Sequence, residues 1–190
     1  MEALILSTAV VALAEMGDKT QLLSFVLAAR LKKRLPIICG ILFATLANHY
    51  LAGYVGAWLA GVVSPQALRW IVALSFFAFG AWALVPDKLE DHRALRGAGV
   101  LLTTLVAFFL VEMGDKTQLA TIALAARYDS LITVVLGTTL GMMIANVPAV
   151  WVGAALAQRV NMKALRRVAA ALFVVLGVLA LLAPAASGGG

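Results

Sequence analysis

The sequence predicts an all-α, polytopic membrane protein with six transmembrane helices arranged as two inverted three-helix repeats. Composition is the first of three observations behind this prediction. Hydrophobic residues make up 63% of the 190 residues and charged residues 13%, against about 45–50% and about 25% in soluble domains. A soluble domain of this length cannot bury so many apolar side chains. The same composition excludes a disordered chain, and the single cysteine, Cys39, excludes a disulfide scaffold.

The second observation is a succession of six apolar segments, since a helix of about 20 residues suffices to cross a bilayer. In chain order these segments cover Ala3–Ala29, Leu35–Val62, Leu68–Leu84, Ala98–Ala126, Leu131–Ala157 and Val168–Ala183. Charged or turn-forming residues separate them in the same order, at Arg30–Arg34, Ser64–Pro65, Pro86–Arg96, Arg127–Ser130 and Gln158–Arg167. Because several segments are longer than 20 residues, we expect a tilt or a break within some of the helices.

An internal repeat is the third observation. A shift of 97 residues places Glu15–Leu22 on Glu112–Leu119 without a mismatch. Each copy holds three apolar segments, and this odd number makes the second copy enter the membrane from the opposite side. The predicted parts are therefore a first three-helix repeat (1–85), a cytoplasmic connecting loop (86–97), a second, inverted three-helix repeat (98–184) and a flexible tail (185–190). Inverted repeats are typical of transporters whose substrate site lies near the midplane.

Lysine and arginine residues predict the orientation in the membrane. Eleven of the fifteen lie in the first, third and fifth loops, whereas the second and fourth loops carry only Arg69 and Arg127. Because basic loops remain on the cytoplasmic side, both termini are predicted to lie outside. The net charge of +6 then belongs to loops beside the lipid bilayer, and we expect no nucleic-acid partner.

Ionisable residues inside the first and fourth segments are the strongest functional signal. They lie near the predicted midplane, where an Asp or Lys at a helix centre costs about 2.5–3.5 kcal/mol, so they must face one another or a water-filled cavity. They are Glu15, Asp18, Lys19, Glu112, Asp115 and Lys116. In a continuous helix the spacing places the first three on one face, whereas Gly17 allows a local break that exposes carbonyl oxygens.

Charge and ligand chemistry point to a cation site. Four carboxylates and two lysines leave a charge of −2, which a divalent cation neutralises. All-oxygen ligands suit Ca²⁺, Mg²⁺ or Mn²⁺, and metal binding expels protons from carboxylates. Competition between metal and protons for one site, with access alternating between the two sides, is antiport. The alternative is a purely structural set of Glu–Lys and Asp–Lys bridges between two helices.

Other polar residues inside the segments are auxiliary candidates for the site. The lysines limit surplus negative charge and pair with the acids when no metal is bound. The threonines and glutamines that follow the lysines either supply neutral oxygens to the site or form interhelical hydrogen bonds. Three polar residues further along the chain either line the ion path and relay a proton, or join two helices by a hydrogen bond. These residues are Lys19, Lys116, Thr20, Thr117, Gln21, Gln118, Asn48, His49 and Asn146.

The doubled Glu-x-Gly-Asp-Lys-Thr motif, at Glu15–Thr20 and Glu112–Thr117, resembles the signature of the small cation/proton antiporters. That family includes bacterial manganese exporters of the MneA type and Golgi calcium/manganese transporters. The resemblance extends from Glu2 to about Ala183, and it implies six helices with pseudo-twofold symmetry. It also implies that the cation ligands are Glu15, Asp18, Glu112 and Asp115, and that the ion is Mn²⁺ or Ca²⁺. The short connection Pro86–Arg96 is similar to that of prokaryotic members.

The expected function is therefore export of Mn²⁺, with Ca²⁺ as the other candidate, across the bacterial plasma (inner) membrane in exchange for H⁺. We expect no permanently bound cofactor and no enzymatic activity, and the sequence leaves a homo-oligomer open. One alternative is an exporter of small organic ions, in which the lysines bind a carboxylate. Another is a structural protein or passive channel. A membrane enzyme with paired aspartates is less well supported, because the sequence has no Gly-x-Gly-Asp.

Overall fold

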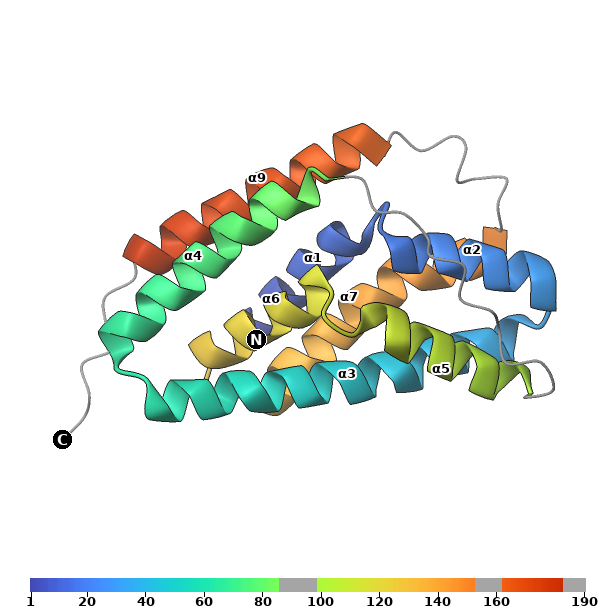
Figure 1. Cartoon of the computed structure of the whole chain (residues 1–190), viewed down its shortest axis with the longest axis horizontal. Helices are drawn as coiled ribbons and strands as arrows, with labels where there is room; N and C mark the ends of the chain where they lie inside the picture. The colour runs from blue at the N-terminus through green and yellow to red at the C-terminus, as the bar shows by residue number, and fades with distance from the viewer. Residues whose placement is uncertain (86–98, 153–161, 183–190) are drawn as a thin grey trace.

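The structure, a computed structural model, describes residues 1–85, 99–152 and 162–182, and within these ranges it consists of helices without strands (Figure 1). The helices are α1 (Glu2–Glu15), α2 (Lys19–Leu31), α3 (Arg34–Val62), α4 (Pro65–Ala83), α5 (Val100–Glu112), α6 (Lys116–Arg127), α7 (Leu131–Val152) and α9 (Met162–Leu182). The all-α prediction is confirmed. The predicted connecting loop (86–97) and tail (185–190) lie outside the described residues.

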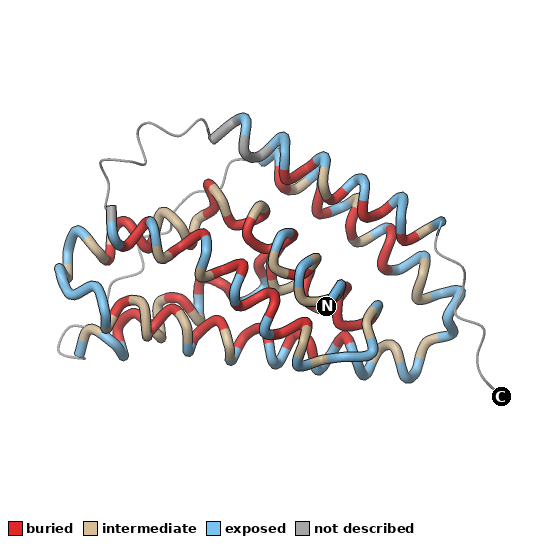
Figure 2. The backbone as a smooth tube through the Cα atoms, turned by 180° about the vertical axis from the view of Figure 1, so that it is seen from behind, coloured by how far each residue is buried: buried red, intermediate tan, exposed pale blue. Residues whose placement is uncertain are grey.

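Helix length and surface composition agree with a polytopic membrane protein. Three described helices are long and apolar enough to cross a bilayer, namely α3, α4 and residues Leu131–Trp151 of α7. Large apolar side chains are exposed on their outer faces, including those of Tyr54, Trp58, Leu74 and Leu140. Figure 2 shows the buried positions turned inward and the exposed ones outward along the helices. Such a surface suits lipid, because a water-soluble protein seldom exposes large contiguous apolar areas.

The first and fourth predicted segments each form two helices instead of one. Helix α1 ends at Glu15 and α2 begins at Lys19, while α5 ends at Glu112 and α6 begins at Lys116. The predicted break within long segments is thus confirmed and falls inside both copies of the motif. A smaller difference concerns the predicted interruption Gln158–Arg167, since α9 already begins at Met162.

Helices from the two halves of the chain pack in matching pairs. Helix α1 packs mainly on α7 and α5 mainly on α3, while α4 packs on α9. In Figure 1 the chain runs from left to right through α1 and α2, and from right to left through α5 and α6. Matched segments of the two halves therefore run in opposite directions, as an inverted duplication predicts.

Two glycines make the same close helix contact in both halves. A Cβ atom on Gly40 would lie 2.9 Å from the Leu101 carbonyl oxygen, and one on Gly137 would lie 2.7 Å from the equivalent oxygen of Leu4. Within the same helix, a Cβ on Gly141 would lie 2.5 Å from the Thr8 carbonyl oxygen. At Gly137 and Gly141, α7 and α1 therefore approach so closely that only glycine fits.

Candidate metal centre

Both copies of the motif break the helix with the same backbone conformation. The first residue of each break is extended, with φ −62° and ψ 116° at Met16 and φ −64° and ψ 120° at Met113. A glycine with positive φ follows, at 83° for Gly17 and 76° for Gly114. The aspartates then cap the next helices, α2 and α6. The sequence allowed either a continuous face or a break at the glycine, and the structure adopts the break.

We expect Gly114→Ala to lower the free energy of unfolding by about 1–2 kcal/mol, because an L-residue at positive φ is strained. A clash does not contribute, since an added Cβ would meet no atom within 4 Å. Gly61 is the matched control: its Cβ would also meet nothing, but it lies within α3 without a positive φ. Gly61→Ala should raise stability by about 0.5–1 kcal/mol.

Denaturant titration in detergent micelles, followed by tryptophan fluorescence, measures both changes. Equal shifts for Gly114→Ala and Gly61→Ala would contradict the strained-turn explanation.

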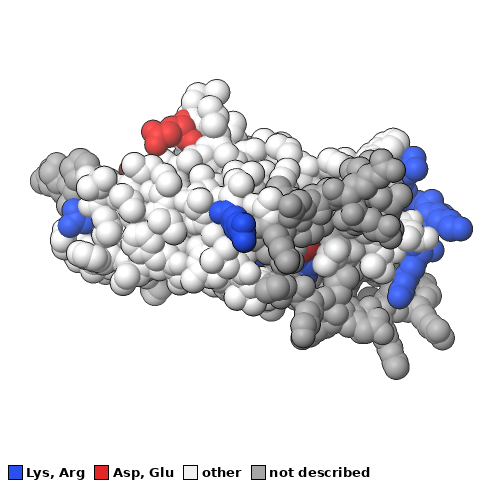
Figure 3. Space-filling view, turned by 90° about the horizontal axis from the view of Figure 1, so that it is seen from above, with Lys and Arg blue, Asp and Glu red and all other residues white. Residues whose placement is uncertain are grey.

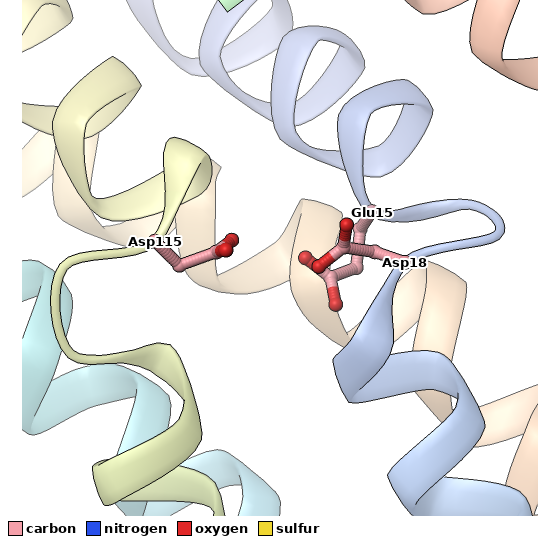
Figure 4. A group of neighbouring side chains, drawn as sticks. All are labelled: Glu15, Asp18 and Asp115. Atoms are coloured by element: carbon pink, nitrogen blue, oxygen red, sulfur yellow. The ribbon is translucent and has the colours of Figure 1, made fainter. Parts of the chain in front are cut away.

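Three of the four predicted carboxylates converge between the two breaks. Each of Glu15, Asp18 and Asp115 offers one oxygen, and these oxygens lie within 4.8 Å of one another. Figure 4 shows Glu15 and Asp18 on one break, with Asp115 reaching toward them from the other. All three are at most 1% exposed. Buried carboxylates this close repel one another unless cations or protons neutralise them, so the cluster has the composition of a hard-cation site.

The two lysines of the motif pair across the halves of the chain. Lys116 donates from Nζ to Asp18 Oδ1, and Lys19 Nζ lies 3.0 Å from Asp115 Oδ1. Each lysine therefore contacts the aspartate of the other motif copy. These are the Asp–Lys bridges of the structural alternative, but they account for only two of the three clustered carboxylates.

Glu15 is the third carboxylate and has a different environment. It is completely buried, and within the described part of the chain neither of its oxygens has a hydrogen-bond partner. A buried ionised group without compensation is very costly. A cation or a proton bound at Glu15 would therefore stabilise the cluster.

Glu112, the fourth predicted carboxylate, lies outside this cluster and contacts α3. His49 Nε2 is 2.9 Å from its Oε1, while Thr45 and Asn48 donate to its Oε2 at 3.4 and 3.5 Å. At the repeat offset these α3 residues correspond to Met142, Ala145 and Asn146 on α7. The two motif glutamates, equivalent in sequence, thus have unequal surroundings.

Most of the remaining residues that the sequence predicted as auxiliary to the site form hydrogen bonds. Asn146 Oδ1 accepts from Ser24 at 2.7 Å, which joins α7 to α2. Thr117 donates its hydroxyl to Asp115 Oδ2 at 3.2 Å, while the buried Thr20 hydroxyl has no hydrogen-bond partner among the described residues. The carbonyl oxygens of Gln21 and Gln118 accept from the glycine N–H groups of the breaks.

Sequence reasoning missed one member of this polar environment, Thr45. It lies one helical turn before His49 on α3 and contacts the same glutamate. The i, i+4 spacing of Thr45 and His49 places both on one helix face and could have indicated this contact. A single threonine inside an apolar segment is not by itself a sign of a functional site.

The chain is similar to known proteins over most of its length. The model of the family described as "Divalent cation/proton antiporter GDT1" matches residues 3–91 and 100–187. A Vibrio cholerae protein named "Putative manganese exporter" is 46% identical, and the alignment covers 94% of this chain and 90% of that protein. GDT1-like protein 5 of Arabidopsis thaliana is 28% identical over 94% of each chain. A GDT1-like protein of Synechocystis is 27% identical, over 88% of this chain and 91% of its own.

No solved structure matches the chain. The family match nevertheless spans both copies of the motif and nearly all the described helices. The resemblance predicted from the motif is confirmed: the chain belongs to the GDT1 family of divalent cation/proton antiporters and is a membrane transporter of divalent cations.

Proposed function

We propose that the protein exports Mn²⁺ in exchange for protons. The observation that carries this proposal is the cluster of Glu15, Asp18 and Asp115, in which two carboxylates contact lysines and the third has no hydrogen-bond partner among the described residues. Three carboxylates and two lysines leave this cluster with a net charge of −1. One proton neutralises that charge and a divalent cation more than offsets it, and the two compete because metal ligands must be deprotonated.

Mn²⁺ is the proposed ion for two reasons. Carboxylate oxygens suit Mn²⁺ as well as Ca²⁺ and Mg²⁺, and the Vibrio cholerae relative carries a manganese exporter's name. Ca²⁺ remains the second candidate. We propose Glu15, Asp18, Glu112 and Asp115 as the ligands over the whole transport cycle. In the present conformation all of them except Glu112 lie together in the cluster.

The proposed membrane arrangement is six spans in two inverted three-helix repeats with both termini outside. The opposite course of matched helices in Figure 1 supports the inversion. For the orientation, Figure 3 shows the largest group of Lys and Arg side chains on that face at one end of the molecule. The turn from α2 to α3 carries exposed basic residues, Arg30, Lys32, Lys33 and Arg34. With this end in the cytoplasm of a bacterium, an inward proton gradient drives the metal out.

Purified protein in liposomes tests the coupling. We expect an acidic lumen to drive accumulation of Mn²⁺ inside the liposomes, since protons leave as the metal enters, and we expect little accumulation without a pH gradient. Parallel measurements with Ca²⁺ and Mg²⁺ give the preferred ion. A flux of Mn²⁺ that ignores the pH gradient would indicate a passive channel and contradict antiport.

Proton release tests the site itself. Adding Mn²⁺ to weakly buffered wild-type protein should acidify the solution, and the doubly substituted Asp18→Asn, Asp115→Asn protein should release far fewer protons. Unchanged release from this variant would place the exchange at other residues.

A further inference from the structure

Two glutamines occupy the same place at the two helix breaks. Gln21 Oε1 accepts from the N–H of Gly17 at 2.8 Å, and Gln118 Oε1 accepts from the N–H of Gly114 at 2.7 Å. A helix break within a membrane leaves backbone C=O and N–H groups that must find partners inside the protein. Each glutamine carbonyl accepts from the N–H of the positive-φ glycine in its own break and so meets this need.

The amide nitrogens of the same side chains reach the other half of the chain. Gln21 Nε2 donates to the Ala145 carbonyl oxygen on α7 at 3.0 Å. Gln118 Nε2 donates to Asn48 Oδ1 on α3 at 3.5 Å. Positions 48 and 145 are equivalent at the 97-residue offset, so the same connection occurs twice, once to a backbone carbonyl and once to a side chain.

We propose that Gln21 and Gln118 are positioning residues, which set the shape of the two breaks and fasten each break to the long helix of the opposite half. Both polar atoms of each glutamine are used in these hydrogen bonds. We therefore assign the two glutamines to the support of the site. This inference rests on the proposed function, because it treats the breaks as the elements that carry the metal ligands.

The position of Gln21 explains why its loss should affect the metal. Asp18 immediately follows Gly17, and its N–H donates to the Glu15 carbonyl oxygen at 3.0 Å across the break. Loosening this turn shifts two carboxylates of the cluster together. Metal sites lose affinity when the groups that orient their ligands are removed, typically by about 10–100-fold.

Two substitutions at position 21 separate the two hydrogen bonds. Gln21→Met retains the length of the side chain but removes both, whereas Gln21→Glu retains an oxygen for Gly17 and loses the N–H donor to Ala145. In liposomes, we expect Gln21→Met to raise the KM for Mn²⁺ about tenfold. Gln21→Glu should keep the KM within about twofold of wild type or lower, because its added negative charge also attracts the metal.

The connection to α7 needs a readout that does not depend on transport. Spin labels on cysteines placed at the exposed positions Arg30 on α2 and Ile144 on α7, in a Cys39→Ser background, report the α2–α7 distance distribution in metal-free protein. We expect this distribution to broaden in both Gln21→Met and Gln21→Glu. The matched control is Gln66→Met, at an exposed position in the first turn of α4, which should change neither measurement.

A wild-type KM in Gln21→Met, or a wild-type distance distribution in both variants, would overturn the inference. Failure of the wild-type protein to transport Mn²⁺ would instead contradict the proposed function. The distance measurement would still decide whether Gln21 fastens α2 to α7.

Discussion

Replacing Glu15 by Gln is expected to lower Mn²⁺ transport by at least about 100-fold. Removing a group that only orients a ligand costs a metal site about 10–100-fold, and Glu15 is proposed as a ligand itself. The reason is the charge of the cluster. Asp18 contacts Lys116 and Asp115 contacts Lys19, so without Glu15 two carboxylates face two ammonium groups. A neutral cluster no longer gains from binding a divalent cation, and Gln fits the same volume without disturbing the fold.

Initial rates of Mn²⁺ uptake into liposomes measure this effect. The matched control is Glu2→Gln, the same substitution at an exposed residue of the same helix, which should transport at a rate near wild type. Near-normal uptake by Glu15→Gln would mean that the surplus charge of the cluster does not bind the metal.

Lys116→Met is expected to lower the free energy of unfolding by about 3–5 kcal/mol in metal-free detergent. Lys116 is 4% exposed and contacts Asp18, which is 1% exposed, and removing one partner of a buried ion pair leaves a buried charge uncompensated. Mn²⁺ should stabilise this variant more than wild type, because the metal replaces the missing positive charge. Lys19→Met should cost less, since the Lys19 side chain is 24% exposed.

Denaturant titration with and without Mn²⁺ measures these differences. The exposed Lys32 provides the control, and Lys32→Met should change stability by no more than about 0.5 kcal/mol. If Mn²⁺ stabilised the Lys116→Met variant and wild type equally, the metal would not replace the positive charge of the lysine.

The sequence predicted the fold class and the clustered acids because both depend on local patterns. Apolar segments long enough to span a bilayer predict transmembrane helices wherever they occur. Acidic residues such as Asp18 and Asp115 stand out inside them because burying them in lipid is costly. Their convergence is what an inverted duplication predicts, since equivalent residues of an inverted pair meet near the axis that relates them.

The pairing of lysines could not be predicted from spacing. Helical periodicity places Lys19 beside Glu15 on a continuous face, but the positive φ of Gly17 redirects the chain before that face forms. Lys19 then reaches Asp115 instead. The only sign in the sequence that Glu15 and Glu112 would have different surroundings is that His49 in the first half corresponds to Asn146 in the second. The sequence did not indicate which glutamate His49 would contact.

The exchange of partners between the halves has a consequence for biogenesis. The lysine that contacts Asp18 lies 98 residues later in the chain, so the ribosome has made more than half of the protein before it appears. During insertion the first carboxylates must remain hydrated or protonated near the translocon until α6 arrives. Neither half can complete the centre alone, and assembly of the transporter ends with the joining of two segments that entered the membrane at different times.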